Sequence, residues 1–275
     1  MKALLKLIHF EVRRFRWFLF GLMALTALVQ IAATVIFALD ERTARLSLYG
    51  QDLKPMRDPM SVYHLMTRHQ EIYALPVMIC IVSLLIYAFV IWYRDWLGRG
   101  TFIYRLLMLP QPRAYLYLAK LAAMLLFIFS LLSLQLALLL VIEGIFSAIM
   151  PAEFRLEARF ADLVAGNELI AFLLPISPKV FLQYYGMGIV LLLAAFTASL
   201  LERSRRPAGI VLALAYAAAM LVIPFGVILA GATGLYESLG LYIHEIIWIA
   251  VGVWLAGGAI AAWLGIRALN KNVSV

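Results

Sequence analysis

Residues 17–39 read WFLFGLMALTALVQIAATVIFAL, an unbroken run of 23 residues without Lys, Arg, Asp or Glu. A helix needs about 20 apolar residues to cross the hydrocarbon core of a bilayer. A charged residue at the middle of such a helix would cost roughly 2.5–3.5 kcal/mol on insertion scales. The run is too long for the apolar region of a typical signal peptide, and no clear A-x-A cleavage site follows it. We therefore expect it to be retained as a transmembrane helix.

Five further runs of the same kind follow along the chain, at 72–93, 121–142, 180–201, 207–230 and 246–266. The composition agrees, because 65% of the residues are hydrophobic and 14% are charged, against about 25% charged residues in ordinary soluble domains. Membrane β-barrels would show alternating segments of about ten residues instead of continuous apolar runs. The sequence thus predicts an all-α polytopic membrane protein, a single domain over residues 1–275 with six transmembrane helices.

The distribution of Lys and Arg predicts how these spans are oriented. With a cytoplasmic N-terminus, 15 of the 23 Lys and Arg residues and three of the 15 Asp and Glu residues fall on the inner side. The opposite orientation would violate the positive-inside rule. We therefore expect both termini to be cytoplasmic, so that the net charge of +8 reflects topology and no nucleic-acid partner is needed to explain it. Aromatic residues predict interface belts at the ends of the spans: Trp17, Trp92, Trp96 and Trp263 inside, and Tyr73, Tyr184, Tyr185, Tyr242 and Trp248 outside.

The segments between the spans also carry patterns. Lys2, Lys6, His9, Arg13 and Arg16 would form one basic stripe on a helix, which favours an interfacial amphipathic helix over residues 1–16. The alternative is a plain continuation of the first span, and in either case we expect His9 and Glu11 to be surface groups. Residues 40–71 and 143–179 are predicted extracellular loops. Pro and Gly residues between the last two spans predict a re-entrant segment before the last helix.

Small residues mark two faces that favour close helix packing. They recur every four positions at Gly209, Ala213 and Ala217 and again at Gly257, Ala261 and Gly265. Spacing alone leaves open whether these faces pack within the chain or against a second subunit.

Polar residues within the spans are neutral. Thr26, Gln30 and Thr34 share one face of the first predicted span, and Gln135 lies in the third. These side chains are candidates for lining a translocation path. Interhelical hydrogen bonds are the alternative role for each of them.

Candidate catalytic and metal-binding groups are sparse. Cys80 is the only cysteine and lies in an apolar run, so we expect a buried structural thiol rather than a reactive one. The loop carboxylates are scattered, and we predict no metal site and no catalytic residue. His244 with Glu245, and His64 with His69, are the only pairs that come near an enzyme site. The chain has no G-x-x-x-x-G-K-[ST] phosphate loop, so any ATP hydrolysis is expected on another chain.

Residues 94–120 read RDWLGRGTFIYRLLMLPQPRAYLYLAK and join the second and third predicted spans. Thr101 can cap a helix from Phe102 to about Leu109, which Pro110 and Pro112 would end. On that helix Phe102, Leu106 and Leu109 would form a short apolar face, with Ile103 and Leu107 beside it. Such a short apolar face suits a groove on a soluble partner; a loop lying on the membrane is the alternative.

This loop resembles the corresponding cytoplasmic loop of the ABC-2 permease family. That family shows an acidic residue, a Gly-Thr step, a Leu-Leu pair, a Leu-Pro step, a basic residue and a later Lys. Here these are Asp95, Gly100-Thr101, Leu106-Leu107, Leu109-Pro110, Arg113 and Lys120, with Asp95 where Glu is more usual. The resemblance implies that the loop carries a coupling helix that docks on a separate ATPase, with Asp95, Gly100, Thr101, Phe102, Leu106, Leu107, Pro110 and Arg113 as the coupling residues.

The resemblance also implies a function and a set of partners. The chain would be the permease subunit of an exporter in the bacterial plasma membrane. Two ATPase subunits, which bind ATP and Mg²⁺, and a second permease chain would complete it, and no cofactor is expected on this chain. The uncharged spans favour an amphiphilic cargo such as a peptide antibiotic, a lipid-linked molecule or a drug. The alternatives are a membrane sensor or immunity protein that does not transport, and an interfacial membrane enzyme.

Overall fold

The computed structural model describes residues 2–49, 59–96, 108, 111–156, 159–165, 167–204, 211–216, 218–219, 222 and 242–271. Over these ranges the chain is helical, with only an isolated bridge between Met60 and Arg155 and no β-strand. Its helices are α1 (Lys2–Tyr49), α2 (Val62–Arg68), α3 (Gln70–Trp96), α5 (Ala114–Ile149), η1 (Ala152–Phe154), α6 (Phe160–Ala165), α7 (Glu168–Leu173), α8 (Pro178–Ser204) and α10 (Ile243–Lys271).

Five of these helices are long and apolar enough to cross a membrane: Lys2–Ser47, Gln70–Trp96, Ala114–Ile149, Pro178–Glu202 and Trp248–Asn270. This confirms the prediction of an all-α chain with several membrane-length helices. Most of the predicted span 207–230, and nearly all of the predicted re-entrant segment, lie outside the residues that the structure describes. The sixth span and the orientation therefore remain predictions.

The first helix differs from the prediction, because α1 runs without a break through residues 16 and 17. The structure thus has the continuous helix that was the alternative to a separate interfacial helix over residues 1–16. Its sequence explains the continuity, since residues 2–49 contain no proline and only one glycine, Gly21. The predicted basic stripe is present, because all five of its side chains are exposed. The helix also extends to Tyr49, ten residues beyond the predicted end of the span.

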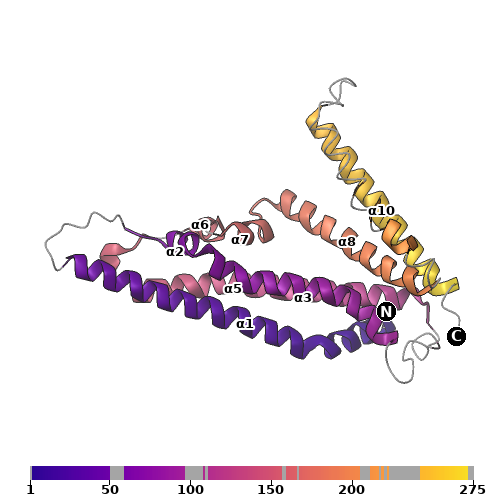
Figure 1. The fold of residues 1–275 in the computed structure, drawn as a ribbon, viewed down its shortest axis with the longest axis horizontal. Helices are drawn as coiled ribbons and strands as arrows, with labels where there is room; N and C mark the ends of the chain where they lie inside the picture. Colours follow the sequence, from indigo (N-terminus) through magenta and orange to yellow (C-terminus); the bar gives the residue numbers. More distant parts are fainter. Residues whose placement is uncertain are drawn as a thin grey trace. The chain divides into compact units, whose positions relative to one another are not determined.

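Residues 13–84 and 125–181 form one compact unit. Within it α1, α3 and α5 run side by side (Figure 1). The short helices α2, α6 and α7 contribute to its hydrophobic core through buried residues such as Leu65, Leu163 and Ile170. Asn167 fixes the start of α7, because its side chain accepts hydrogen bonds from the backbone N–H groups of Leu169 and Ile170. The predicted loops 40–71 and 143–179 therefore contain ordered helices packed on the ends of longer ones.

Residues 1–12, 85–124 and 182–275 form the second unit. Here α8 and α10 are joined by a hydrogen bond from Thr197 Oγ1 to the carbonyl oxygen of Ala261, at 2.7 Å. A Cβ atom added to Gly265 would lie 2.7 Å from the ring of Tyr117 in α5. The small-residue face at Ala261 and Gly265 is therefore used for packing within the chain.

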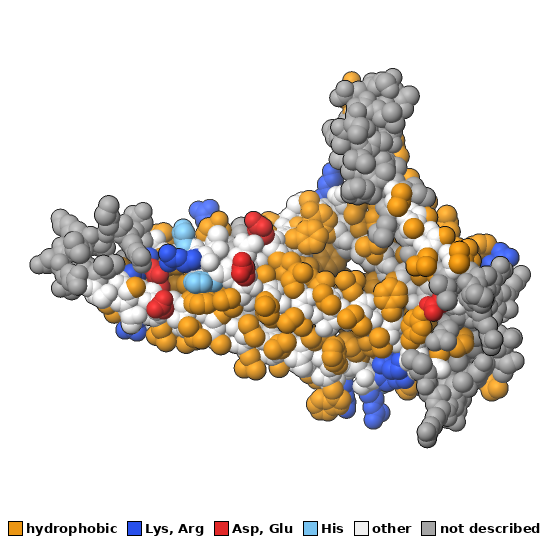
Figure 2. Space-filling model, viewed as in Figure 1, with side chains coloured by type: hydrophobic (Ala, Val, Ile, Leu, Met, Phe, Trp, Pro, Cys, Tyr) orange, Lys and Arg blue, Asp and Glu red, His pale blue; other side chains and the backbone are white. Residues whose placement is uncertain are grey.

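Large hydrophobic side chains cover much of the helical surface, as expected of helices that face lipid (Figure 2). Trp17, Trp248 and Trp263 are among them, with 74%, 65% and 57% of their surface exposed. Trp92 and Tyr73 depart from the predicted aromatic belts because both are buried inside the protein. In the same view, charged and histidine side chains gather around α2.

Candidate functional site

Two oppositely charged side chains meet where α3 ends and α5 begins. Lys120 Nζ lies 2.5 Å from Asp95 Oδ2, and neither side chain has any exposed surface. Lys120 also donates to Glu11 Oε1 at 2.9 Å and to the backbone carbonyl of Ile91 at 2.8 Å. An ammonium group has three N–H donors, so each donor of Lys120 has an acceptor.

Glu11 joins this pair to a second cation. It lies in the N-terminal part of α1. Its Oε1 accepts from Lys120, and its Oε2 accepts from Arg94 Nη2, also at 2.9 Å. The Glu11 side chain is 2% exposed and that of Arg94 is 26% exposed. We call Glu11, Arg94, Asp95 and Lys120 the charge cluster. Its two carboxylates and two cations cancel, which is the condition under which charges are tolerated away from water.

A group of buried aromatic side chains adjoins the charge cluster at Lys120. Lys120 Nζ lies 5.1 Å from the centre of the Trp92 ring, a cation–π distance. Trp92, Tyr117 and Phe196 contact one another with ring centroids 5.7–6.0 Å apart, and all three are buried. Ion pairs are strengthened in such surroundings, but the loss of one partner becomes expensive, at about 3–5 kcal/mol.

Further contacts tie this region to the C-terminal helices. Arg113, just before α5, donates from Nη1 to the carbonyl oxygens of Leu269 and Asn270, at 2.7 and 3.3 Å. These carbonyls belong to the last turn of α10, where a cation is favourable. Tyr93 donates a hydrogen bond to Glu202 near the end of α8. Both ends of the segment 94–120 are thus fixed to α1, α8 and α10.

The predicted coupling residues fall into two groups. Asp95 and Arg113 belong to the contacts just described. The other six, and the predicted helix from Phe102 to Leu109 apart from Met108, lie outside the described residues: Gly100, Thr101, Phe102, Leu106, Leu107 and Pro110. Their coupling role stays a prediction.

The four predicted path residues lie in the other unit, and all of them are buried. Gln30 and Gln135 exchange hydrogen bonds at 3.2 and 3.3 Å, and Gln30 also donates to the carbonyl of Tyr73. Thr34 bonds the Tyr73 hydroxyl at 3.0 Å. Thr26 lies 3.3 Å from the sulfur of Cys80, which is buried as expected. The structure thus places these side chains in interhelical hydrogen bonds, while the translocation path remains a prediction.

Glu11 was expected at the surface, and that expectation is wrong, because only 1% of the residue is exposed. The sequence holds one indication that Glu11 differs from its neighbours. It is the only acidic residue among residues 1–39, and it lies off the basic stripe. Lys120 was identified only through the family resemblance. Its burial was missed because it lies at the predicted edge of a span, where a lysine usually extends toward water.

Three of the four residues considered for an enzyme have other contacts, and the side chain of the fourth, His244, lies outside what the structure describes. The Glu245 carboxylate accepts from the backbone N–H of Tyr242 at 2.8 Å and so caps the start of α10. The His69 ring stacks on Phe37 with centroids 3.7 Å apart, and His64 Nδ1 lies 3.0 Å from Ser61 Oγ. Over the ranges that the structure covers, no three His, Cys, Asp or Glu residues are grouped to hold a metal ion. Comparisons with protein-family models, curated proteins and solved structures found no match.

Proposed function

We propose that this chain is the membrane-spanning subunit of an ATP-driven exporter of the ABC-2 type. In this proposal it lies in the bacterial plasma membrane with six spans and both termini in the cytoplasm. Two copies of a separate ATPase subunit bind ATP and Mg²⁺, and a second permease chain, identical or related, completes the transporter. The cargo is an amphiphile: a peptide antibiotic, a lipid-linked molecule or a drug.

The single observation that carries this proposal is the charge cluster. A loop that receives force from an ATPase needs a stiff base, or its movement would be lost in local bending. Asp95 and Lys120 stand at the two ends of the segment 94–120 and are joined at 2.5 Å. Glu11 adds the N-terminal part of α1 to the same contact. A displacement of the loop would then move the N-terminal part of α1, the end of α3 and the start of α5 together.

The apolar spans support the choice of an amphiphilic cargo. The six predicted spans contain no charged residue, and intramembrane acids or bases are the usual sign of proton- or ion-coupled transport. Energy from ATP on a partner chain removes the need for such groups here.

The direct test is whether this chain co-purifies with an ATPase whose gene lies beside its own. Leu106→Glu and Leu107→Glu place a charge on or beside the predicted docking face and should abolish co-purification with the ATPase and transport. Met108→Glu is the matched control, because Met108 is not among the residues of the predicted apolar face and 68% of the residue is exposed. The docking proposal fails if the Leu106 and Leu107 variants still bind the ATPase and still transport.

A second measurement separates transport from sensing. Deletion of the chain should reduce efflux of an amphiphilic antibiotic and lower resistance to it. If no ATPase co-purifies and efflux is unchanged in the deletion strain, the sensor or immunity alternative replaces the exporter.

A further inference from the structure

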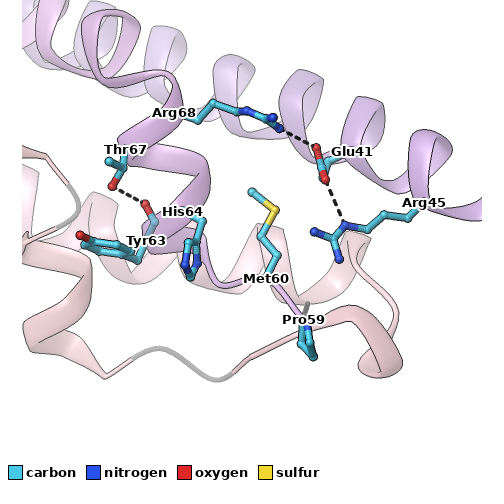
Figure 3. Close-up of a pocket in the computed structure, with 8 residues that line it drawn as sticks. All are labelled: Glu41, Arg45, Pro59, Met60, Tyr63, His64, Thr67 and Arg68. Carbon is cyan, nitrogen blue, oxygen red and sulfur yellow. Dashed lines mark hydrogen bonds and ion pairs between the residues drawn. The ribbon is translucent and has the colours of Figure 1, made fainter. Parts of the chain in front are cut away.

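A pocket of about 500 Å³ lies between the C-terminal part of α1 and α2 (Figure 3). This volume falls within the range of about 300–1,000 Å³ that is typical of small-molecule sites. Its eight lining residues include two arginines and one carboxylate, a net charge of +1 with His64 neutral. The lining therefore favours an anionic ligand over a cationic one.

Glu41 organises the charged side of the α1–α2 pocket. Its Oε1 accepts from Arg45 Nε at 3.1 Å, and its Oε2 accepts from Arg68 Nη1 at 3.2 Å. Only 10% of the Glu41 side chain is exposed. With both carboxylate oxygens engaged and the group nearly covered, Glu41 serves to hold guanidinium groups in place rather than to attract a cation.

Arg68 is the group best suited to contact a ligand. Its side chain is 58% exposed, and its bond to Glu41 is its only ion pair or hydrogen bond within the described part of the chain. A guanidinium has five N–H donors in a planar fork that matches phosphate and carboxylate oxygens. Figure 3 shows Arg68 reaching from α2 across the pocket to Glu41 on α1, with His64 also on α2 and Met60 below. The contact with Glu41 thus orients the Arg68 guanidinium, while most of the guanidinium N–H donors remain available to a ligand.

The position of the pocket along α1 indicates where such an anion would come from. Glu41 follows the apolar run 17–39 by two residues, which is a rise of about 3 Å along a helix. A site at that level coincides with the headgroup layer of a bilayer spanned by α1. Amphiphiles are concentrated there, with their charged groups at the depth of Arg68.

We propose that the α1–α2 pocket binds the phosphate or carboxylate group of an anionic amphiphile at the membrane surface, with Arg68 as its principal contact and Glu41 as the residue that positions Arg68. This site does not depend on the proposed ATPase partner, because it is built from one unit of this chain alone.

The test is direct binding to the full chain in phosphatidylcholine nanodiscs. The titrants are short-chain phosphatidic acid, short-chain phosphatidylcholine and inorganic phosphate. We expect saturable binding of phosphatidic acid, at least tenfold weaker in Arg68→Gln and intermediate in Arg68→Lys, which keeps the charge but loses the fork. Arg42→Gln is the matched control, because Arg42 is an exposed cation next to Glu41 that does not line the pocket.

Each other outcome overturns part or all of the proposal. Equal binding by wild type and Arg68→Gln, or no saturable binding of phosphatidic acid, removes the site. Equally tight binding of phosphatidylcholine removes the preference for a net anion. Inorganic phosphate bound as tightly as phosphatidic acid assigns the site to a free anion instead of an amphiphile. Arg68→Gln should fold normally, since the Arg68 side chain is 58% exposed and Glu41 keeps its ion pair with Arg45. The thermal transition of the variant provides that check.

Discussion

Lys120 Nζ lies 2.5 Å from Asp95 Oδ2, although 25 positions separate the two residues in the chain. Both side chains are fully buried, so the pair cannot relax by turning into water. The contact joins the end of α3 to the start of α5. Glu11 and Arg94 complete a set of four charges whose sum is zero.

Replacing Lys120 by Met should destabilise the chain strongly. Asp95 would lose its buried cation, and Glu11 would keep only Arg94. Removal of one partner from a buried ion pair costs about 3–5 kcal/mol, so we expect a large fall in the thermal unfolding temperature in detergent.

Two variants show whether the cost comes from unpaired charge. Lys6→Met removes an exposed cation from the same basic N-terminal region and should change the transition little. Asp95→Asn added to Lys120→Met removes the buried negative charge that faced Lys120 and should recover part of the loss. Equal thermal unfolding temperatures for Lys6→Met and Lys120→Met would contradict this account of the charge cluster.

Arg113 should protect the last turn of α10. Its Nη1 donates to the carbonyl oxygens of Leu269 and Asn270, and a cation at a helix C-terminus contributes about 0.3–1 kcal/mol. Arg113→Ala should therefore speed amide hydrogen exchange in that turn about 2–5-fold. Lys179→Ala, at an exposed position in the first turn of α8, is the control and should leave that exchange unchanged. Unchanged exchange in Arg113→Ala would show that the capping contact does not stabilise the turn.

Apolar runs in the sequence were enough to predict the long helices, because a membrane span leaves a strong and local signal. Their ends were harder to predict. The sequence pattern marks where apolar residues stop, but a helix stops only where its backbone is broken or capped. Thus α1 continues past Leu39 to Tyr49 through charged residues, and α5 continues to Ile149.

The charge cluster shows why a candidate site is harder to predict than a span. Asp95 and Lys120 could be identified from the loop motif. The sequence around Glu11 does not predict that its side chain contacts these two residues. That contact depends on which helices pack together. The same holds for Arg68 and Glu41, which come from different helices and meet only in the folded chain.

Gln30 and Gln135 should be energetically coupled. Their side-chain amides exchange two hydrogen bonds across two helices and are buried. Such pairs in membrane proteins contribute about 0.6 kcal/mol on average and at most about 1.7 kcal/mol. A double-mutant cycle of Gln30→Leu and Gln135→Leu, followed by unfolding in detergent, should give a coupling energy in that range. A parallel cycle of Gln30→Leu with Ser130→Ala should give none, because Ser130 bonds the carbonyl of Leu126 in its own helix. Additive effects in the first cycle would exclude a stabilising interhelical bond.

Gly265 should not tolerate a methyl group, whereas Gly252 in the same helix should. A Cβ at Gly265 would lie 2.7 Å from Tyr117 Cε2 and 3.0 Å from Thr197 Oγ1, but a Cβ at Gly252 would meet nothing within 4 Å. The Tyr117 ring cannot easily move away, because Trp92 and Phe196 hold it. Overpacking costs about 1–3 kcal/mol, while alanine gains up to about 1 kcal/mol over glycine in a helix. We therefore expect Gly265→Ala to lower the thermal transition and Gly252→Ala to preserve or raise it. Both variants share the gain in helix propensity, so the difference between their thermal unfolding temperatures measures the cost of the clash at Gly265. Equal unfolding temperatures would show that α10 does not pack against Tyr117 as closely as this contact requires.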